Sequence, residues 1–194
     1  MTRDKALELL HTHMQNPNLR KHCYAVEAVM RALYRRLEDG NQTQEEEEKW
    51  GIAGVLHDAD YEETKDNAKT AHKKKVLEWL EVADAHVDIK DAIASHAWNY
   101  VEEAPEPKTK MQWALYTCDE LTGLIIAVAL IKPDKRLASV SVDSVLKKWN
   151  SPSFAAGVDR KQIEMCEGRL NIPLREFVQI SIGAMQFIHE DLGL

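Results

Sequence analysis

The chain has 194 residues, of which 44% are hydrophobic and 29% are charged, so it is long enough for one globular domain and unlike a disordered chain. Its formal net charge of −7 argues against broad binding to nucleic-acid backbones or anionic membranes, but leaves room for a small anion in a local pocket. The three cysteines are widely spaced and form no CxxC pair, and the N-terminus has no signal-peptide core, so we expect a reducing, cytoplasmic location.

Apolar residues repeat at helical spacing along nearly the whole chain, and no segment shows convincing β alternation, which predicts an all-α fold. Asn18 and Asp66 are the N-caps expected for two of the helices, and Asp159 with Gln162 resembles a capping box. The apolar stretch 121–131 is too short to span a bilayer and predicts a buried helix. In chain order, we expect helices over residues 2–14, 18–37, 45–57, 66–82, 88–100, 109–131, 140–150, 159–168 and 173–192.

The stretch GIAGVLHDADYEET, residues 51–64, brings a histidine and a carboxylate together at the end of an apolar helix. Carboxylates are unfavourable at the carbonyl end of a helix, so the pair His57-Asp58 calls for a specific partner. Neighbouring residues point about 100° apart on a helix, so both side chains can reach one point only where the helix ends or bends. Gly51 and Gly54 allow this helix to pack closely against another just before that end.

Three further histidines and one aspartate lie on the apolar faces of predicted helices, namely His22, His72, His96 and Asp119. An unpaired carboxylate in a helix as apolar as that around Asp119 is costly, and a divalent cation is the strongest partner available to it. Helical position alone is not selective, because His11 and His86 can also be placed near apolar residues, and a lone inward histidine is more often a hydrogen-bonded core residue. The adjacent His57-Asp58 pair favours a metal site.

These residues, in the order H…HD…D with long gaps, resemble the HD-domain superfamily of metal-dependent phosphohydrolases. The matching segments are RKHCYAVE with His22, AGVLHDADYE with His57 and Asp58, and YTCDELTG with Asp119, and the resemblance covers about residues 20–125. Later segments are similar to a prokaryotic subgroup of predicted hydrolases. The resemblance implies a single helical domain of the HD type, with a core at about 18–131 and a C-terminal helical extension at about 139–192.

For this family the resemblance implies a metal held by His22, His57, Asp58 and Asp119. In members with two metals, two additional histidines bind the second ion while the HD aspartate bridges, and His72 and His96 stand in the right order for that role. The alternative is one ion, with both histidines in the core or supporting the ligands. Imidazole and carboxylate donors suit Mn, Fe, Co, Ni or Zn, and Mg less well.

Other residues near the HD pair are candidates for supporting roles. Asp58 is a candidate catalytic residue, and Asp60 and Glu62 could orient the attacking water or hold a ligand histidine by its second nitrogen. Acidic residues after a helix end are also often simply solvated. Glu120 points away from Asp119 on its helix and is expected at the surface or behind the site.

The sequence therefore favours a metal-dependent phosphohydrolase that acts on a small phosphate ester, with a nucleotide as the first guess, by metal-activated water. We expect no nucleic-acid polymer or membrane as partner. One alternative is a regulatory module that binds metal or nucleotide without hydrolysis. Another is a helical interaction protein whose buried histidines and aspartates form a hydrogen-bond network without metal.

Overall fold

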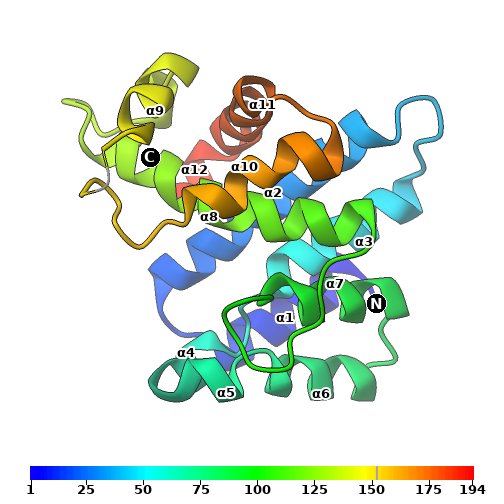
Figure 1. The fold of residues 1–194 in the computed structure, drawn as a ribbon. Helices are drawn as coiled ribbons and strands as arrows, with labels where there is room; N and C mark the ends of the chain where they lie inside the picture. The colour runs from blue at the N-terminus through cyan, green and yellow to red at the C-terminus, as the bar shows by residue number, and fades with distance from the viewer. Residues whose placement is uncertain (152) are drawn as a thin grey trace.

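A computed structural model describes residues 1–151 and 153–194, and in this part of the chain the regular elements are all helices (Figure 1). The all-α prediction is therefore confirmed. The α-helices are α1 (Arg3–His13), α2 (Pro17–Leu37), α3 (Gln44–Leu56), α4 (Tyr61–Thr64), α5 (Ala68–Ala71), α6 (Lys74–Val82), α7 (Val87–His96), α8 (Lys110–Leu130), α9 (Val142–Trp149), α10 (Arg160–Leu170), α11 (Leu174–Phe187) and α12 (His189–Leu192). Short 3-10 helices occur at η1 (Lys65–Asn67) and η2 (Leu137–Ser139).

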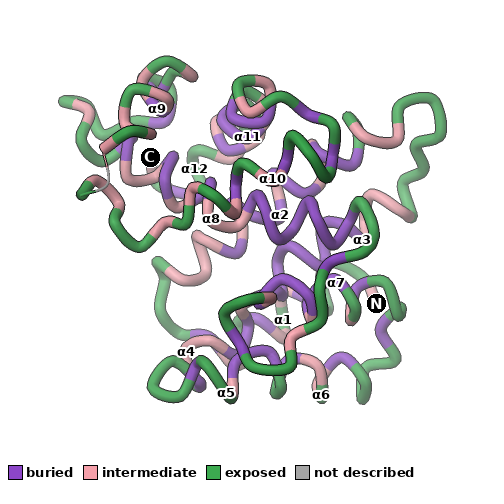
Figure 2. Tube along the Cα trace, viewed as in Figure 1, coloured by how far each residue is buried: buried purple, intermediate pink, exposed green. Residues whose placement is uncertain are grey.

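Helix α8 is the centre of the bundle, and most of it is buried (Figure 2). It packs against α2 on one side and against α7 and α10 on others, while α2 also packs against α3 and α11. By length and composition alone α8 could cross a membrane, but 67% of its most apolar window is buried within the bundle. The buried helix predicted for 121–131 is thus the second half of a longer core helix.

One hydrophobic cluster includes buried residues of α1 to α3 and of α6 to α12, so the C-terminal helices share the core of the others. The packing of α2 on α3 is close because Gly54 has no side chain. A Cβ added there would lie 2.9 Å from the backbone N and Cα of Glu27 in α2. This contact brings the C-terminal end of α3, which carries the HD pair, against the middle of α2.

Several helix ends differ from the predicted ones. Asn16, not Asn18, is the N-cap of α2, because its side-chain oxygen accepts from the amide of Asn18 at 2.9 Å, and Pro17 occupies the first helical position, where no N–H is needed. Asp159 caps α10 as expected, but the side chain of Gln162 donates to a carbonyl of α8 instead of completing a capping box. The helix predicted to end at 100 stops at 96, and the last predicted helix is divided into α11 and α12.

The single helix predicted over 66–82 is wrong, and Asp66 is not its N-cap. The chain forms η1 and α5, leaves the helical conformation at His72 and Lys73, and restarts as α6. Lys73 has a left-handed backbone with φ 68°, which is strained for a residue with a side chain. The carboxylate of Asp60 accepts from two backbone amides in the first turn of α6 and so stabilises this new helix start.

Candidate metal centre

The side chains of all six predicted metal ligands lie together in one cluster, although they come from five places in the chain. His22 lies in α2, His57 and Asp58 follow directly on α3, and Asp119 lies in the middle of α8. His72 occupies the break before α6, and His96 is the last residue of α7. Two groups of three side chains have the spacing of metal ligands: one is His22, His57 and Asp119, and the other is Asp58, His72 and His96. We call them the first and the second triad.

The first triad joins α2, the end of α3, and α8. Oδ1 of Asp119 lies 2.9 Å from Nε2 of His22 and 3.4 Å from Nε2 of His57. The two imidazole Nε2 atoms are 3.2 Å apart. His57 is fully buried, whereas His22 and Asp119 are partly exposed.

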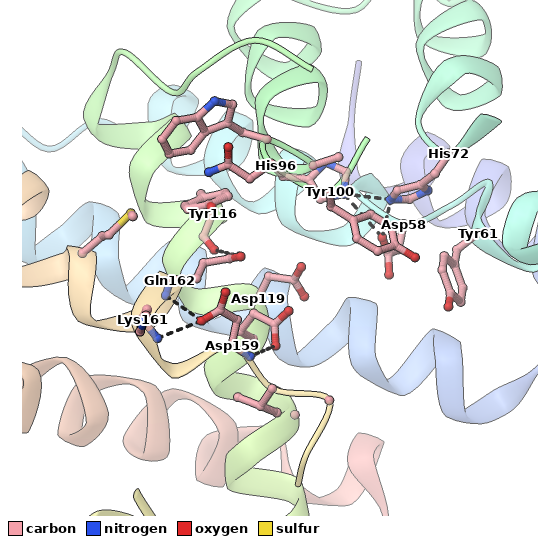
Figure 3. A pocket seen from close by; sticks show the side chains of 18 of the residues that line it. Asp58, Tyr61, His72, His96, Tyr100, Tyr116, Asp119, Asp159, Lys161 and Gln162 are labelled. Atoms are coloured by element: carbon pink, nitrogen blue, oxygen red, sulfur yellow. Dashed lines mark hydrogen bonds and ion pairs between the residues drawn. The ribbon is translucent and has the colours of Figure 1, made fainter. Parts of the chain in front are cut away.

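The second triad joins the end of α3, the break before α6, and the end of α7. Oδ1 of Asp58 lies 3.1 Å from Nε2 of His72 and 3.5 Å from Nε2 of His96. The two Nε2 atoms are 3.0 Å apart, and both histidines are buried. In Figure 3 Asp58, His72 and His96 lie together at one end of a cavity.

Asp58 connects the two triads because its two carboxylate oxygens face different groups. Oδ1 faces the second triad, and Oδ2 lies 3.7 Å from Nε2 of His22 and 3.6 Å from Nε2 of His57 in the first. A carboxylate with one oxygen directed to each of two donor groups is the arrangement of a bridging ligand.

Two of the four histidines are oriented by backbone carbonyls. Nδ1 of His57 donates to the carbonyl of Gly54 at 2.8 Å, and Nδ1 of His96 donates to the carbonyl of Ile93 at 2.6 Å. A carbonyl can only accept, so the proton of each neutral ring is on Nδ1. The lone pair of each Nε2 is therefore directed into the cluster.

The other two histidines are oriented by side chains. Nδ1 of His72 donates to Oδ1 of Asp60 at 2.9 Å. The hydroxyl of Thr122 donates its proton to the carbonyl of Asp119 at 2.9 Å, so it accepts from Nδ1 of His22 at 3.2 Å. In both neutral rings Nε2 is again left as an acceptor.

This donor set fits divalent cations. Four imidazole lone pairs and two carboxylates converge, and lone pairs only about 3 Å apart repel unless a proton or a cation lies between them. The separations of 2.9 to 3.5 Å within each triad agree with the roughly 3 to 3.6 Å expected between neighbouring ligands that bind one ion at about 2.1 Å. The described side chains thus form two His/Asp triads that could hold metal ions.

The histidines and carboxylates of the cluster shift one another's pKa values. Burial alone would lower the pKa of His57, but the carboxylates of Asp58 and Asp119 raise it to about 9. Burial opposes protonation of His72 as well, and hydrogen bonds to Asp58 and Asp60 raise its pKa to about 10. Burial would raise the pKa of the Asp58 and Asp119 carboxyls, but the histidines hold both well below their usual range. The imidazoles of His57 and His72 thus favour the protonated form beside these carboxylates, whereas burial lowers the pKa of His96.

Asp60 and Glu62, the two acidic residues predicted to assist the site, have different positions in the structure. The fully buried Asp60 binds His72 by its second nitrogen, which is one of the two roles considered for it. Glu62 faces away from both triads, and its carboxylate accepts from the amides of Gln15 and Asn16 at 2.7 and 2.9 Å. The described hydrogen bonds of Glu62 do not reach either triad, so a catalytic role for this residue stays a prediction.

A cavity of about 700 Å³ opens over the two triads (Figure 3). Its floor includes His22, Asp58 and Asp119, and Lys161 lies in its wall. The wall also includes residues to which the sequence assigned no role at the site: Tyr61, Trp98, Asn99, Tyr100, Tyr116, Gln162 and Met165. Trp98, Asn99 and Tyr100 follow α7 in a loop that periodicity predicts as the end of the helix over 88–100, and others come from α10, far along the chain. No sequence pattern placed either segment beside the HD pair.

Glu120 also lines the cavity, next to the candidate ligand Asp119. It is half-buried, and its Oε2 accepts from the backbone amide of Asp159 at 3.1 Å. Burial, together with the neighbouring charge of Asp119, raises the pKa of the Glu120 carboxyl to about 7. Glu120 is thus outside both triads, as expected, but it lines the cavity instead of lying behind the site.

The loop before α10 forms part of the cavity wall through Gly157 and Val158. The guanidinium group of Arg160 holds this loop by donating to four of its backbone carbonyls, those of Ser151, Phe154, Ala155 and Val158. The wall therefore depends on one arginine whose described hydrogen bonds all go to backbone carbonyls.

Comparisons of the chain with protein-family profiles and with curated proteins found no match.

Proposed function

We propose that the protein is a metal-dependent phosphohydrolase of the HD type that acts on a small phosphate ester. The observation that supports this most strongly is the position of Asp58, whose two oxygens face one His/Asp triad each. Two adjacent cation sites below an open cavity suit phosphoryl transfer, in which charge must be neutralised on both the attacking and the leaving oxygen.

The side chains of the chain itself would do the following work. Both triads would hold divalent ions, and the partners on Nδ1 would keep each imidazole in the ligating tautomer. When bound, such ions lower the pKa of water and neutralise charge on a phosphoryl group. The aromatic wall of the cavity would exclude bulk water from one side of the substrate.

The donor set of imidazoles and carboxylates leads us to propose Mn, Fe, Co, Ni or Zn, and less readily Mg. We also propose a small phosphorylated molecule as the partner in solution, with nucleotides as the first class to test. The cavity of about 700 Å³ lies within the size range of small-molecule sites.

Metal analysis and a substrate screen test this function together. Protein purified without chelator should contain stoichiometric metal, and at least one phosphomonoester, phosphodiester or nucleotide should be hydrolysed with Mn, Co, Ni or Mg. Asp58→Ala should lose both ions and all turnover, because it removes the carboxylate whose two oxygens face the two triads. Asp66→Ala, at an exposed position outside the cavity, should change neither.

The two alternatives give different results in the same experiment. Stoichiometric metal without turnover of any ester would favour a regulatory module that binds metal or nucleotide. Protein without metal, before and after incubation with Mn or Co, would favour a hydrogen-bonded His/Asp network and refute the phosphohydrolase proposal.

A further inference from the structure

The wall of the cavity carries an unusual balance of charge for a phosphate site. Among the described residues that line it, Lys161 is the only lysine or arginine. Four carboxylates line the same cavity: Asp58, Asp119, Glu120 and Asp159. Sites that hold several phosphoryl groups normally surround them with multiple lysines, arginines or backbone amides.

Two of these carboxylates do not belong to either triad and lie next to each other. Glu120 accepts from the backbone amide of Asp159 at 3.1 Å, which joins the middle of α8 to the start of α10. The carboxylate of Asp159 accepts in turn from two amides of the first turn of α10. Figure 3 shows Asp159 and Lys161 across the cavity from Asp58 and His72. The exposed Lys161 thus shares its part of the wall with two acidic residues.

The charges of the proposed centre suffice for one phosphoryl group at most. Two divalent ions would bring four positive charges, and the carboxylates of Asp58, Asp119 and the buried Asp60 beside His72 offset three of them. The remaining positive charge does not exceed the charge of one phosphomonoester dianion. A second or third phosphoryl group would extend along the wall toward Glu120 and Asp159, where Lys161 is the only lysine or arginine among the described lining residues.

The rest of the wall is uncharged. It includes Tyr61, Trp98, Asn99, Tyr100, Tyr116 and Met165. Aromatic rings and a thioether offer apolar surface, while the phenols and the amide offer a few directed hydrogen bonds. Such a surface suits an uncharged organic group with a flat or apolar part.

From these observations we propose that the substrate carries a single phosphoryl group on an uncharged organic group, and that Glu120 and Asp159 reject di- and triphosphates. This inference rests on the proposed function, since it assumes that the two triads hold the ions that bind the phosphoryl group.

The first test compares substrates that differ only in the number of phosphoryl groups. The Mn-loaded protein is assayed with the mono-, di- and triphosphate of one nucleoside. Free Mn is held at the lowest concentration that keeps both triads occupied, because Mn bound to the polyphosphates would neutralise the charge on which the comparison depends. We expect kcat/KM to be at least roughly tenfold higher for the monophosphate, from one unfavourable charge interaction near a protein surface. Equal or faster hydrolysis of the triphosphate would overturn the proposal.

A second test measures binding without turnover. Calorimetric titration of the Mn-loaded protein with inorganic phosphate, pyrophosphate and tripolyphosphate should give the tightest binding for phosphate. Tighter binding of pyrophosphate, which carries more charge, would contradict the inference. This measurement does not depend on any ester being a substrate.

The double variant Glu120→Gln with Asp159→Asn removes both charges with little change in shape. Asparagine can still cap α10, and glutamine can still accept from the neighbouring amide. The preference for monophosphate over triphosphate should fall by roughly tenfold. The control Glu8→Gln with Asp191→Asn makes the same change in net charge at exposed positions outside the cavity, and should leave the preference unchanged.

The two proposals fail in different ways. If no ester is hydrolysed but the Mn-loaded protein binds phosphate more tightly than pyrophosphate, the phosphohydrolase function fails and the single-phosphoryl preference stands. If esters are hydrolysed and the double variant keeps the full preference, the function stands and the role of Glu120 and Asp159 is refuted. If the protein binds no metal, both proposals are refuted.

Discussion

Replacing Asp60 with asparagine tests whether a buried carboxylate supports the second triad. Its Oδ1 accepts from Nδ1 of His72 at 2.9 Å and from the amide of Lys73 at 3.1 Å, and its Oδ2 accepts from the amides of Lys75 at 3.1 Å and Val76 at 3.4 Å. Asparagine has nearly the same shape but replaces one of these oxygens with an NH₂ group. That group cannot accept, so two of the four donors lose their acceptor.

The cost follows from the burial of Asp60, which is completely inaccessible to solvent. Each buried donor left without an acceptor costs roughly 2 kcal/mol, so the free energy of unfolding should fall by about 4 kcal/mol. His72 also loses the partner that fixes its tautomer, and loss of such a partner typically weakens metal affinity by about 10- to 100-fold. The first triad has no contact with Asp60 and should keep its affinity.

Two measurements check this prediction. Urea unfolding of the metal-free protein gives the change in stability, and elemental analysis after equilibration with limiting Mn gives the number of bound ions. We expect two ions per chain for the parent protein and one for Asp60→Asn. The control Glu62→Gln changes a neighbouring carboxylate that contacts only α1–α2 backbone amides, and should retain two ions. Two ions of unchanged affinity in Asp60→Asn would refute the reasoning.

Three other predictions concern the pH dependence, the helix packing and the cavity wall. The pKa of His57 is raised to about 9 and that of His72 to about 10. The contribution of these two groups to the free energy of unfolding of the metal-free protein should therefore be complete below about pH 6.5 and lost as the pH rises through 9 to 10. Metal binding at pH 7 should correspondingly release protons, which calorimetry in buffers of different ionisation enthalpy measures; no release would contradict the protonated cluster. Gly54→Ala should lower the free energy of unfolding in urea by roughly 1–3 kcal/mol and weaken the binding of one ion, because the added Cβ displaces α3. The control Gly168→Ala, which has open space around its Cβ, should be neutral or stabilising by up to about 1 kcal/mol. Equal effects of the two substitutions would refute the packing argument. Arg160→Met should raise KM several-fold with little change in kcat, because it releases the loop before α10 that forms part of the cavity wall. A fall in kcat alone would show that this loop does not position the substrate.

Much of the centre could be predicted because its signals are local. Helical periodicity placed His22 and Asp119 on inward faces, and the adjacent pair at the end of an apolar helix indicated a ligand set before any contact was known. Gly54 indicated close packing just before that pair, and in the structure the backbone of α2 lies too close to this position for a Cβ atom. These inferences needed only the order and spacing of residues.

Other parts of the centre depend on contacts between segments that local rules do not connect. Periodicity placed His72 inside a continuous helix, but Asp60 binds the first amides of α6 and breaks that helix at His72. Two neighbouring acids, Asp60 and Glu62, are alike in sequence, yet one is buried against a histidine and the other binds the α1–α2 connection.

By itself the sequence determined the helical class and the set of histidines and aspartates that face inward, because side-chain periodicity and helix capping act over a few residues. The tertiary structure alone decided that these residues form two triads joined by Asp58, and that α10 and the loop after α7 enclose them. The reason is physical: a buried carboxylate takes whichever donors the packing of distant helices brings within hydrogen-bond distance, and that choice is made only when the core is assembled.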